Sequence, residues 1–472
     1  MALAVNKKGF SSLYIIMVLS ALMLLILTVI ESASGYALRS RAEAICRLSG
    51  ESVLSEYQPG LWRRYGIFAV RASNERLSAL ANFYVGENLT VQGDNILRMK
   101  MMSCVADTQE YPALDTHRFA AQVHSAGAIL TAEALLFDEN SGSILSNVDK
   151  ALTLSDMLRT DSEEALLQAE APPEDEASEE IGNAQEKARM RSLLKRYRDS
   201  GQPVYDEVLW TKSIPSGTAA ENLPTHCLDV PVRKMLLSGA TLPGPSALLE
   251  SAYILDKCSN GLNIAEGSSL DLEVEYILFG LPSDQENYEQ IRSSLFWLRS
   301  ALNLAHIYGN PQKKSEVTAL AASALALIPL PAAAFIVAGI WAAVEARSDV
   351  ELLLSGKTVP FIKSAEDWST DLDGALRAGP AADSLQRTSA DIGSYGDYLR
   401  FFLLMADSRD RLVRLMDVMQ LNVAGIEGGA FCFRDYAYGF NMEVRFEKQI
   451  RFPGYSGTGM RGATVVQKHV YQ

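Results

Sequence analysis

Residues 7–31, KKGFSSLYIIMVLSALMLLILTVIE, decide the architecture of this chain of 472 residues. After Lys7 and Lys8 no charged residue occurs until Glu31, which leaves a charge-free run from Gly9 to Ile30. An α-helix rises about 1.5 Å per residue, so this run is long enough to cross a hydrocarbon core about 30 Å thick. The sequence therefore predicts a transmembrane helix over residues 10–30, a cytoplasmic tail over 1–9 and an extracytoplasmic location for the remainder of the chain.

A secretory signal peptide begins in the same way, with basic residues before an apolar run. The run here is longer than the usual signal core of about 7–15 residues, which favours a retained single-pass anchor in the cell membrane. A cleavage site of small residues is nevertheless present at Ala33-Ser34-Gly35. Cleavage there stays open as an alternative to retention.

Helical spacing continues beyond the apolar run. Apolar residues recur at three- and four-residue steps, namely Leu38, Ala42, Ile45 and Leu48. This spacing predicts a helical stalk over residues 31–58, with bends at Gly35 and Gly50, that ends at Pro59.

The remaining sequence predicts a mainly helical ectodomain. Its first part covers residues 59–155 and includes an amphipathic helix over 115–138. Residues 156–200 form an acidic linker followed by a basic helix, because ten acidic residues and no basic one lie between Asp161 and Glu186. A helical core over 201–430 follows, with helices over 291–305, 398–405 and 412–421.

A second uncharged run covers residues 317–344 and has two interpretations. Its length suits a second membrane span. However, the run is rich in alanine, Pro329 and Pro331 interrupt its centre, and Lys313 and Lys314 would flank it on the outer side of the membrane. These features favour a buried helical hairpin, while a two-span protein remains the alternative.

Three segments show the two-residue alternation of β-strands. Leu272, Val274 and Tyr276 alternate with acidic residues, Met442, Val444 and Phe446 alternate with charged residues, and residues 464–471 are strand-like. The last two segments predict a β-hairpin or small sheet within a C-terminal β element over 431–472. The expected fold class is therefore mainly α with a small β element (α+β).

Composition and motifs indicate no chemistry that the chain performs. A net charge of −14 argues against nucleic acid as a partner. Ser192 with Lys195 matches an SxxK spacing, His117 and His124 share one helix face, and Gly454–Gly462 superficially resembles a phosphate loop. None has a second motif, a third ligand or a following helix, so we expect no catalytic residue, no metal and no cofactor.

The five cysteines include no CxxC pair, which excludes a disulfide-scaffold fold. Cys227 with Cys258 is the one candidate pair, and the sequence leaves open whether any disulfide forms. Asn88-Leu89-Thr90 matches a glycosylation sequon by pattern alone.

The N-terminus resembles that of type IV pilins and Tad-type pseudopilins. The resemblance rests on Lys7-Lys8-Gly9-Phe10, the charge-free helix and the helical stalk. It implies cleavage by a membrane peptidase between Gly9 and Phe10, after which the helix serves as a packing spine. Tyr14 stands where those proteins carry an acidic residue, whereas Glu31 resembles the glutamate that follows the apolar stretch of TadE- and TadG-like proteins.

A broader resemblance covers nearly the whole chain. It rests on these segments: Glu31-Ser32, Glu56-Tyr57, Tyr65-Gly66-Ile67-Phe68, Glu275 to Gly280, Gly356 to Pro360, Glu366-Asp367-Trp368, Asp397 to Arg400 and Gln420-Leu421-Asn422. They are similar to an uncharacterised bacterial family with one N-terminal anchor, associated with Tad-like pilus or secretion genes. The resemblance implies a membrane-anchored location and an association with pilus or secretion genes. It identifies no catalytic residues.

The expected function is that of a membrane-anchored structural or accessory protein of a Tad or type IV pilus-like envelope assembly, and not that of an enzyme. Residues 10–30 would contact membrane lipid. Small side chains would let this helix pack against other pseudopilin-like helices, namely Ser11, Ser12, Ser20 and Ala21. A membrane-anchored hydrolase is the principal alternative.

Overall fold

The computed structural model describes residues 7–91, 99–134, 146–154, 156–158, 160–161, 227–228, 245–324, 329–372, 375, 393–426, 431–448 and 462–471. The chain divides into two compact units: unit 1 comprises Met1–Gln122 and Gly429–Gln472, and unit 2 comprises Val123–Gly428. Several predictions lie outside the described residues, namely the linker beyond Asp161, the basic helix, Ser192 with Lys195, and the glycine-rich loop before Gly462.

Unit 1 is built from segments at both ends of the chain. Its helices and strands are α1 (Lys7–Leu54), α2 (Pro59–Tyr65), β1 (Val70–Arg71), α3 (Asn74–Val91), β2 (Met99–Asp107), the 3-10 helix η3 (Phe433–Asp435), β3 (Tyr436–Ala437), β4 (Gly439–Lys448) and β5 (Gly462–Val470). The amphipathic helix predicted over 115–138 is α4 (Thr116–Ala134), whose residues divide between the two units after Gln122.

The C-terminal β element that the sequence predicts is present and forms part of a larger sheet. Strands β4 and β5 pair antiparallel, with Val444 opposite Val465. Strand β2 pairs antiparallel with the other edge of β4, which gives the order β2-β4-β5. Apolar residues of β4 are buried and the charged residues between them are exposed, as the alternation predicts.

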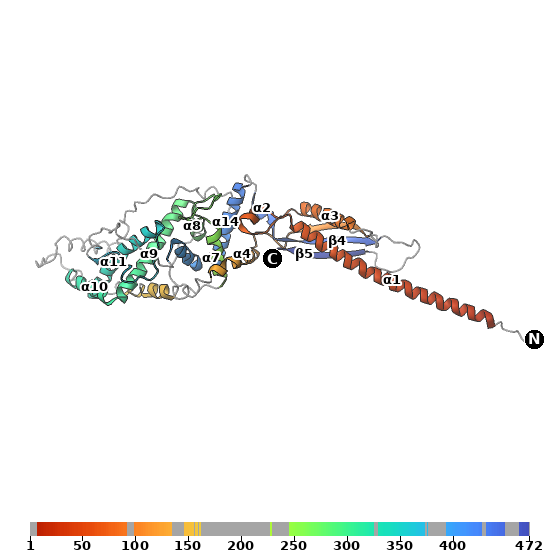
Figure 1. Cartoon of the computed structure of the whole chain (residues 1–472), viewed down its shortest axis with the longest axis horizontal. Coiled ribbons are helices and arrows are strands. Elements are labelled where there is room, and N and C mark those ends of the chain that lie inside the picture. Colours follow the sequence, from red (N-terminus) through yellow and green to blue (C-terminus); the bar gives the residue numbers. More distant parts are fainter. Residues whose placement is uncertain are drawn as a thin grey trace, which may run out of the picture. The chain divides into compact units, whose positions relative to one another are not determined.

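Helix α1 covers one face of this sheet with its C-terminal half and projects beyond it with its N-terminal half (Figure 1). The sheet-facing residues belong to one hydrophobic core, in which Leu38, Ala42, Ile45 and Val53 are at most 1% exposed. Helix α3 packs beside α1 on the same sheet. The stalk predicted from helical spacing is thus an integral part of a folded unit.

Neither predicted bend interrupts α1, which is helical through Gly35 and Gly50. The helix also ends at Leu54, before Pro59, and Pro59 begins α2. This outcome follows from the preference of proline for the first turn of a helix, where no intrahelical partner for its backbone nitrogen is needed.

Unit 2 is helical in the part that the structure describes. Its elements are α7 (Pro245–Lys257), α8 (Glu273–Phe279), α9 (Asp284–Gly309), α10 (Pro311–Ala324), α11 (Leu330–Leu354), α13 (Tyr395–Met405) and α14 (Ser408–Ile426). The helices predicted over 291–305, 398–405 and 412–421 lie within α9, α13 and α14. Helices α9, α10 and α11 pack against one another around Trp341, Val337 and Ile307.

Two described helices are long and apolar enough to cross a membrane: the segment Ser12–Leu54 of α1, and α11. They differ in their surroundings. No residue in the most apolar 18-residue stretch of α1 is buried. In the most apolar 18-residue stretch of α11, 61% is buried inside unit 2.

The strand expected around Leu272, Val274 and Tyr276 is wrong, since these residues lie in or beside helix α8. Glu273 and Glu275 alternate with the apolar residues but are themselves fully buried. Glu273 accepts a hydrogen bond from the backbone nitrogen of Ser259 at 2.7 Å, and Glu275 accepts one from the backbone nitrogen of Gly261 at 3.1 Å. The alternation therefore does not separate a buried face from an exposed face.

The candidate disulfide between Cys227 and Cys258 is absent, because all five cysteines, each within the described residues, are free thiols. Cys227 is instead held by its backbone nitrogen, which donates to Asp417 Oδ1 at 2.8 Å.

A close contact between α1 and β5 gives a test of this architecture. A Cβ atom on Gly50 would lie 2.1 Å from Cε1 of the buried His469 ring. We expect Gly50→Ala to lower the free energy of unfolding by about 1–3 kcal/mol, because the ring and the helix have to move apart. Thermal unfolding followed by circular dichroism measures the effect.

Gly86→Ala in α3 is the matched control, because nothing lies within 4 Å of the added Cβ. That variant should be neutral or more stable by up to about 1 kcal/mol. Equal stability of the two variants would contradict the packing of α1 on β5.

Candidate functional site

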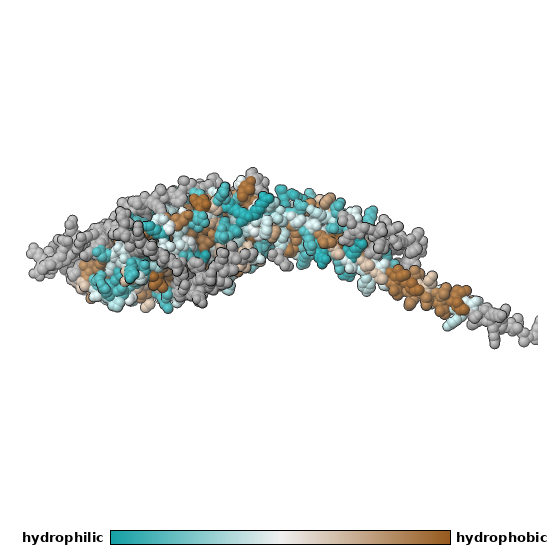
Figure 2. Space-filling view, in the orientation of Figure 1, coloured by the Kyte–Doolittle hydropathy of each residue, from teal (hydrophilic) through white to brown (hydrophobic). Residues whose placement is uncertain are grey.

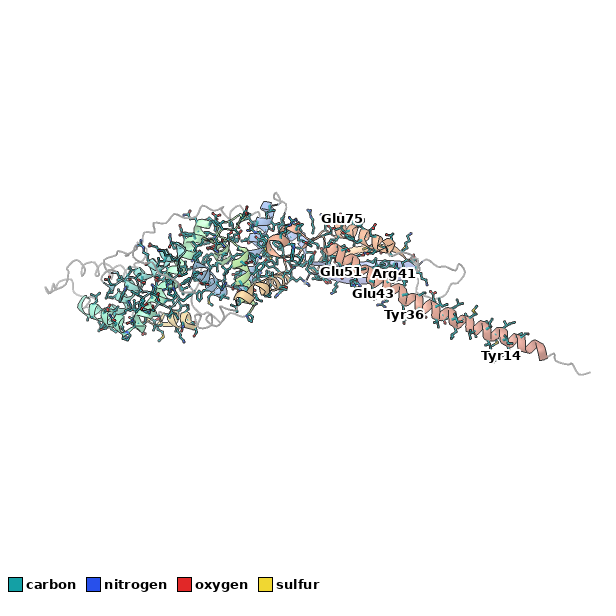
Figure 3. The ribbon with its side chains drawn as sticks, viewed as in Figure 1. Tyr14, Tyr36, Arg41, Glu43, Glu51 and Glu75 are labelled. Carbon is teal, nitrogen blue, oxygen red and sulfur yellow. The ribbon has the colours of Figure 1, made fainter. Side chains whose placement is uncertain are left out.

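The N-terminal half of α1 is the most distinctive surface of unit 1. Its large apolar side chains from Leu13 to Ile30 are each 42–68% exposed. Figure 2 shows this projecting part as a nearly continuous hydrophobic surface, and Figure 3 shows Tyr14 standing out from it. A helix that is apolar all round requires an apolar environment on all sides.

Two hydroxyl groups in this segment are satisfied within the helix itself. Ser20 Oγ donates to the carbonyl oxygen of Met17 at 2.8 Å, and Thr28 Oγ1 donates to that of Leu25 at 2.7 Å. Such internal hydrogen bonds allow serine and threonine to lie in an environment without water. The segment therefore has a surface suited to contact with lipid or to packing against other helices.

The residues predicted for processing and packing all lie on this helix. Gly9 and Phe10 are in its first turn and Ser11 follows them, although the side chains of Phe10 and Ser11 lie outside the description. Ser12, Ser20 and Ala21 are exposed. The structure thus leaves the described small residues accessible, and it tests neither cleavage nor helix packing.

A polar contact joins α1 to the sheet directly after the apolar run. Lys448, the last residue of β4, lies with Nζ 3.5 Å from Glu31 Oε2 and donates to Ser34 Oγ at 2.7 Å. Lys448 was not identified from the sequence, because its partners lie more than 400 positions away and only the fold brings them together.

Further contacts hold the C-terminal half of α1 in place. Gln467 Nε2 donates to the carbonyl oxygen of Glu43 at 3.2 Å, and the Tyr471 hydroxyl donates to that of Leu54. Asn88 Nδ2 donates to Ser49 Oγ at 3.0 Å, so the amide of the predicted sequon is engaged inside unit 1. One half of α1 is therefore fixed to the fold and the other half is free of it.

Unit 2 contains a buried cluster of four charged side chains: Arg299, Glu345, Asp349 and Lys363, each at most 5% exposed. Arg299 Nε donates to Asp349 Oδ2 at 3.1 Å. Lys363 Nζ lies 2.6 Å from Asp349 Oδ1 and also pairs with Glu345. The two positive and two negative charges cancel, so we call these residues the neutral cluster.

Hydrogen bonds complete the neutral cluster. Arg299 Nη1 donates to the carbonyl oxygens of Pro360 and Phe361, each at 3.0 Å, while the backbone nitrogen of Thr370 donates to Glu345 at 2.9 Å. Burial alone would raise the pKa of Glu345, but the charge of Lys363 and hydrogen bonds from Lys363 and Ser369 lower it to about 2. The charged groups of the neutral cluster are paired with one another. The cluster is therefore suited to holding α9, α11 and the segment after α11 together.

A second group brings an exposed serine, a partly exposed histidine and a buried carboxylate together in unit 2. Ser408 Oγ donates to both oxygens of Glu250 at 2.9 Å, and His124 Nε2 lies 3.0 Å from Glu250 Oε1. A serine nucleophile would instead need a hydrogen bond to its base. Among the described contacts of Ser408 and His124, none joins the two residues.

The histidine pair predicted from one helix face gains no further ligand. His117 is exposed at the start of α4, and His124 is engaged by Glu250. Within the described ranges, no group of three or more His, Cys, Asp or Glu residues could hold a metal ion.

The neutral cluster generates a stability prediction. Asp349→Ala leaves Arg299 and Lys363 buried without their shared carboxylate, and we expect it to cost about 3–5 kcal/mol. Urea denaturation followed by tryptophan fluorescence measures this loss. Arg347→Ala on the same helix is the control, because its pair with Glu351 is partly exposed and should contribute below about 1 kcal/mol. Equal losses would contradict a stabilising role for the cluster.

Glu275 gives unit 2 a predictable pH dependence. Its Oε1 accepts a hydrogen bond from the Tyr395 hydroxyl, its Oε2 has no partner in the described structure, and burial raises its pKa to about 7. Between its ordinary value near 4.5 and 7, the folded state keeps a proton that the unfolded state has lost. The free energy of unfolding should therefore fall as the pH rises through this window.

The neutral isostere Glu275→Gln tests this dependence. Urea midpoints at pH 5 and pH 7.5 should differ less in the variant than in the wild type, since the titrating group is gone. Glu316→Gln on the exposed surface of α10 should behave as the wild type does. An unchanged pH dependence in Glu275→Gln would show that Glu275 does not hold a proton in the folded state.

Comparison with known proteins identifies one family. No curated protein matched the chain, and no solved structure did. A family model, described as a family of unknown function (DUF5702), matches residues 171–448. The matched segment begins after α1 and covers more than half of the 472 residues. The chain therefore belongs to DUF5702, a family of unknown function.

Proposed function

We propose that this protein is a membrane-anchored structural or accessory component of a Tad or type IV pilus-like envelope assembly, and that it is not an enzyme. The observation that carries the proposal is the division of α1 into an apolar half with no buried residue in its most apolar stretch and a half that packs in the core of unit 1. A subunit built in this way presents an apolar helix to a membrane or to similar helices while its sheet holds that helix rigidly.

Retention of the N-terminal helix is supported by the contacts of Lys448. This side chain binds Glu31 and Ser34, and Glu31 lies upstream of the signal-type site at Ala33-Ser34-Gly35. Cleavage after Gly35 would remove both contacts and would cut α1 in the middle of a continuous helix. Unit 1 therefore makes contacts through residues that cleavage of a signal peptide would remove from the protein.

A single membrane span is supported by the surroundings of α11. This helix carries Glu345 and Asp349, which are buried and paired within unit 2. Lipid offers no partner for such carboxylates, so their pairing favours a core helix over a second span. With α1 as the one anchor, both units lie on the extracytoplasmic side.

The pilus-like part of the proposal is supported by the resemblance of Lys7-Lys8-Gly9-Phe10 to a prepilin cleavage site. These residues form the first turn of α1, and the apolar segment begins directly after them. Processing between Gly9 and Phe10 would leave Phe10 at the start of the exposed helix. The mature helix would then consist of the apolar segment followed by the half that packs on the sheet.

The N-terminus of protein purified from native membranes tests the proposal. We expect intact-mass and N-terminal peptide analysis to show Phe10 as the first residue. An uncut chain would support a plain anchor and contradict the pilus-like route. A start near Gly35, with protein released from the membrane, would contradict the anchor itself.

Two variants distinguish cleavage by a prepilin-type peptidase from cleavage by a signal peptidase. Gly9→Leu should block cleavage and leave the protein in the membrane fraction. Ala33→Leu changes an exposed residue of the signal-type site and should leave the mature N-terminus unchanged. A changed N-terminus in Ala33→Leu alone would assign processing to a signal peptidase.

A further inference from the structure

The neutral cluster holds an amine against a carboxylate in the interior of unit 2. Lys363 Nζ lies 2.6 Å from Asp349 Oδ1, and the two side chains are at most 1% exposed. Lys257, Lys448 and Lys468 also pair with carboxylates in the described structure, but their side chains are 17–71% exposed. An amine and a carboxyl group held together in this way have the geometric requirement for forming an amide.

Asp349 is bound differently at its two oxygens. Oδ2 accepts hydrogen bonds from Arg299 Nε at 3.1 Å and from Asn303 Nδ2 at 3.0 Å, whereas Oδ1 faces the amine of Lys363. Donors fixed on one oxygen stabilise the negative charge that develops there when the carboxyl carbon becomes tetrahedral. Oδ1 is then the oxygen that leaves. The contacts of Asp349 therefore distinguish an oxyanion position from a leaving group.

Glu345 supplies a proton carrier for the same amine. It pairs with Lys363 Nζ, and its orientation is fixed by hydrogen bonds from the Thr370 backbone nitrogen at 2.9 Å and the Ser369 hydroxyl at 2.6 Å. The low pKa of Glu345 depends on the charge of Lys363, while burial favours the neutral form of both groups. Transfer of one proton from Lys363 to Glu345 thus removes two buried charges in one step.

We propose that Lys363 and Asp349 become joined by an intramolecular isopeptide bond, with Glu345 as the proton carrier. Glu345 takes a proton from Lys363 Nζ and delivers it to Asp349 Oδ1. The neutral amine attacks Cγ, and a C–N bond forms as the π electrons of the carboxyl group move to Oδ2. A second proton passes from Nζ to Oδ1 through Glu345. The Cγ–Oδ1 bond then breaks, one water molecule leaves, and the electrons on Oδ2 restore the C=O bond.

The product keeps the charge balance of the cluster. Condensation removes one positive and one negative charge, which leaves Arg299 paired with no excess charge because Glu345 ends the reaction as a carboxylate. No oxidant, reductant or activating group takes part. The bond links α11 to the segment after it and closes a covalent ring between positions 349 and 363, so it survives complete unfolding of the chain.

Peptide mapping of the full-length wild-type protein tests this proposal. Trypsin cleaves after Arg347 and Lys357 and, where the amine is free, after Lys363. An isopeptide bond blocks the last cleavage and joins peptide 348–357 to peptide 358–377. After denaturation and digestion, we expect mass spectrometry to show this joined species, lighter than its two peptides together by one water molecule, and almost no free peptide 348–357.

Two results would contradict the proposal. Free wild-type peptides, with cleavage after Lys363, would leave the neutral cluster as a set of ion pairs. A bond from Lys363 to Glu345 would join the peptide that ends at Arg347 instead, and would show that the roles of the two carboxylates are assigned wrongly. Both results come from the wild-type protein, so they do not depend on whether a variant folds.

Glu345→Gln tests the proton carrier, since it keeps the shape of the side chain but cannot carry a proton. We expect bond formation to slow by about 100-fold or more, read as the linked fraction at a fixed time after synthesis. Circular dichroism checks that the variant is folded. Glu351→Gln on the same helix is the control, because its pair with Arg347 is partly exposed, and it should be linked as the wild type is. Full linkage in folded Glu345→Gln would exclude Glu345 as the carrier. The N-terminus takes no part, so this result and that for the anchor are independent.

Discussion

The packing of α1 on the three-stranded sheet is the interaction on which unit 1 depends. Leu38 and Ile45 are at most 1% exposed, and complete burial of such side chains contributes about 1.5–3 kcal/mol each. The contact brings together the first helix and the last two strands, so it also closes the chain on itself. Without it, the projecting half of α1 would be attached to no folded structure.

The same helix has to satisfy two different environments. Its C-terminal half gains stability from the sheet, whereas the large apolar side chains from Leu13 to Ile30 gain none from the fold. Exposed apolar surface on this scale marks an interaction site. The contacts of Lys448 with Glu31 and Ser34 stand at the change between the two environments, where a charge can still be paired and reached by water.

Local patterns predicted the elements well and their surroundings poorly. The apolar run, the stalk spacing and the alternation of β4 each reflect one helix or strand, and each is present in the structure. The strand expected around Val274 failed because Glu273 and Glu275 are buried with partners supplied by Ser259, Gly261, Tyr395 and Asn422. Those partners come from separate segments, and alternation alone cannot reveal them.

The candidate sites show the same division. The apolar helix was identified from residues 7–31. The contacts of Lys448 with this helix and the neutral cluster were not identified from the sequence. Arg299, Asp349 and Lys363 carry no motif, since α9, α11 and the segment after α11 bring them together from more than 60 positions of sequence.

We propose that α1 passes from a bilayer into a folded unit within one helix. Photo-crosslinking in native membranes tests it most directly, with a benzophenone amino acid placed at Leu22 or at Tyr36, both of which are exposed. The account predicts phospholipid adducts from position 22 and none from position 36. Absence of lipid adducts at position 22, or equal adducts at both positions, would contradict it.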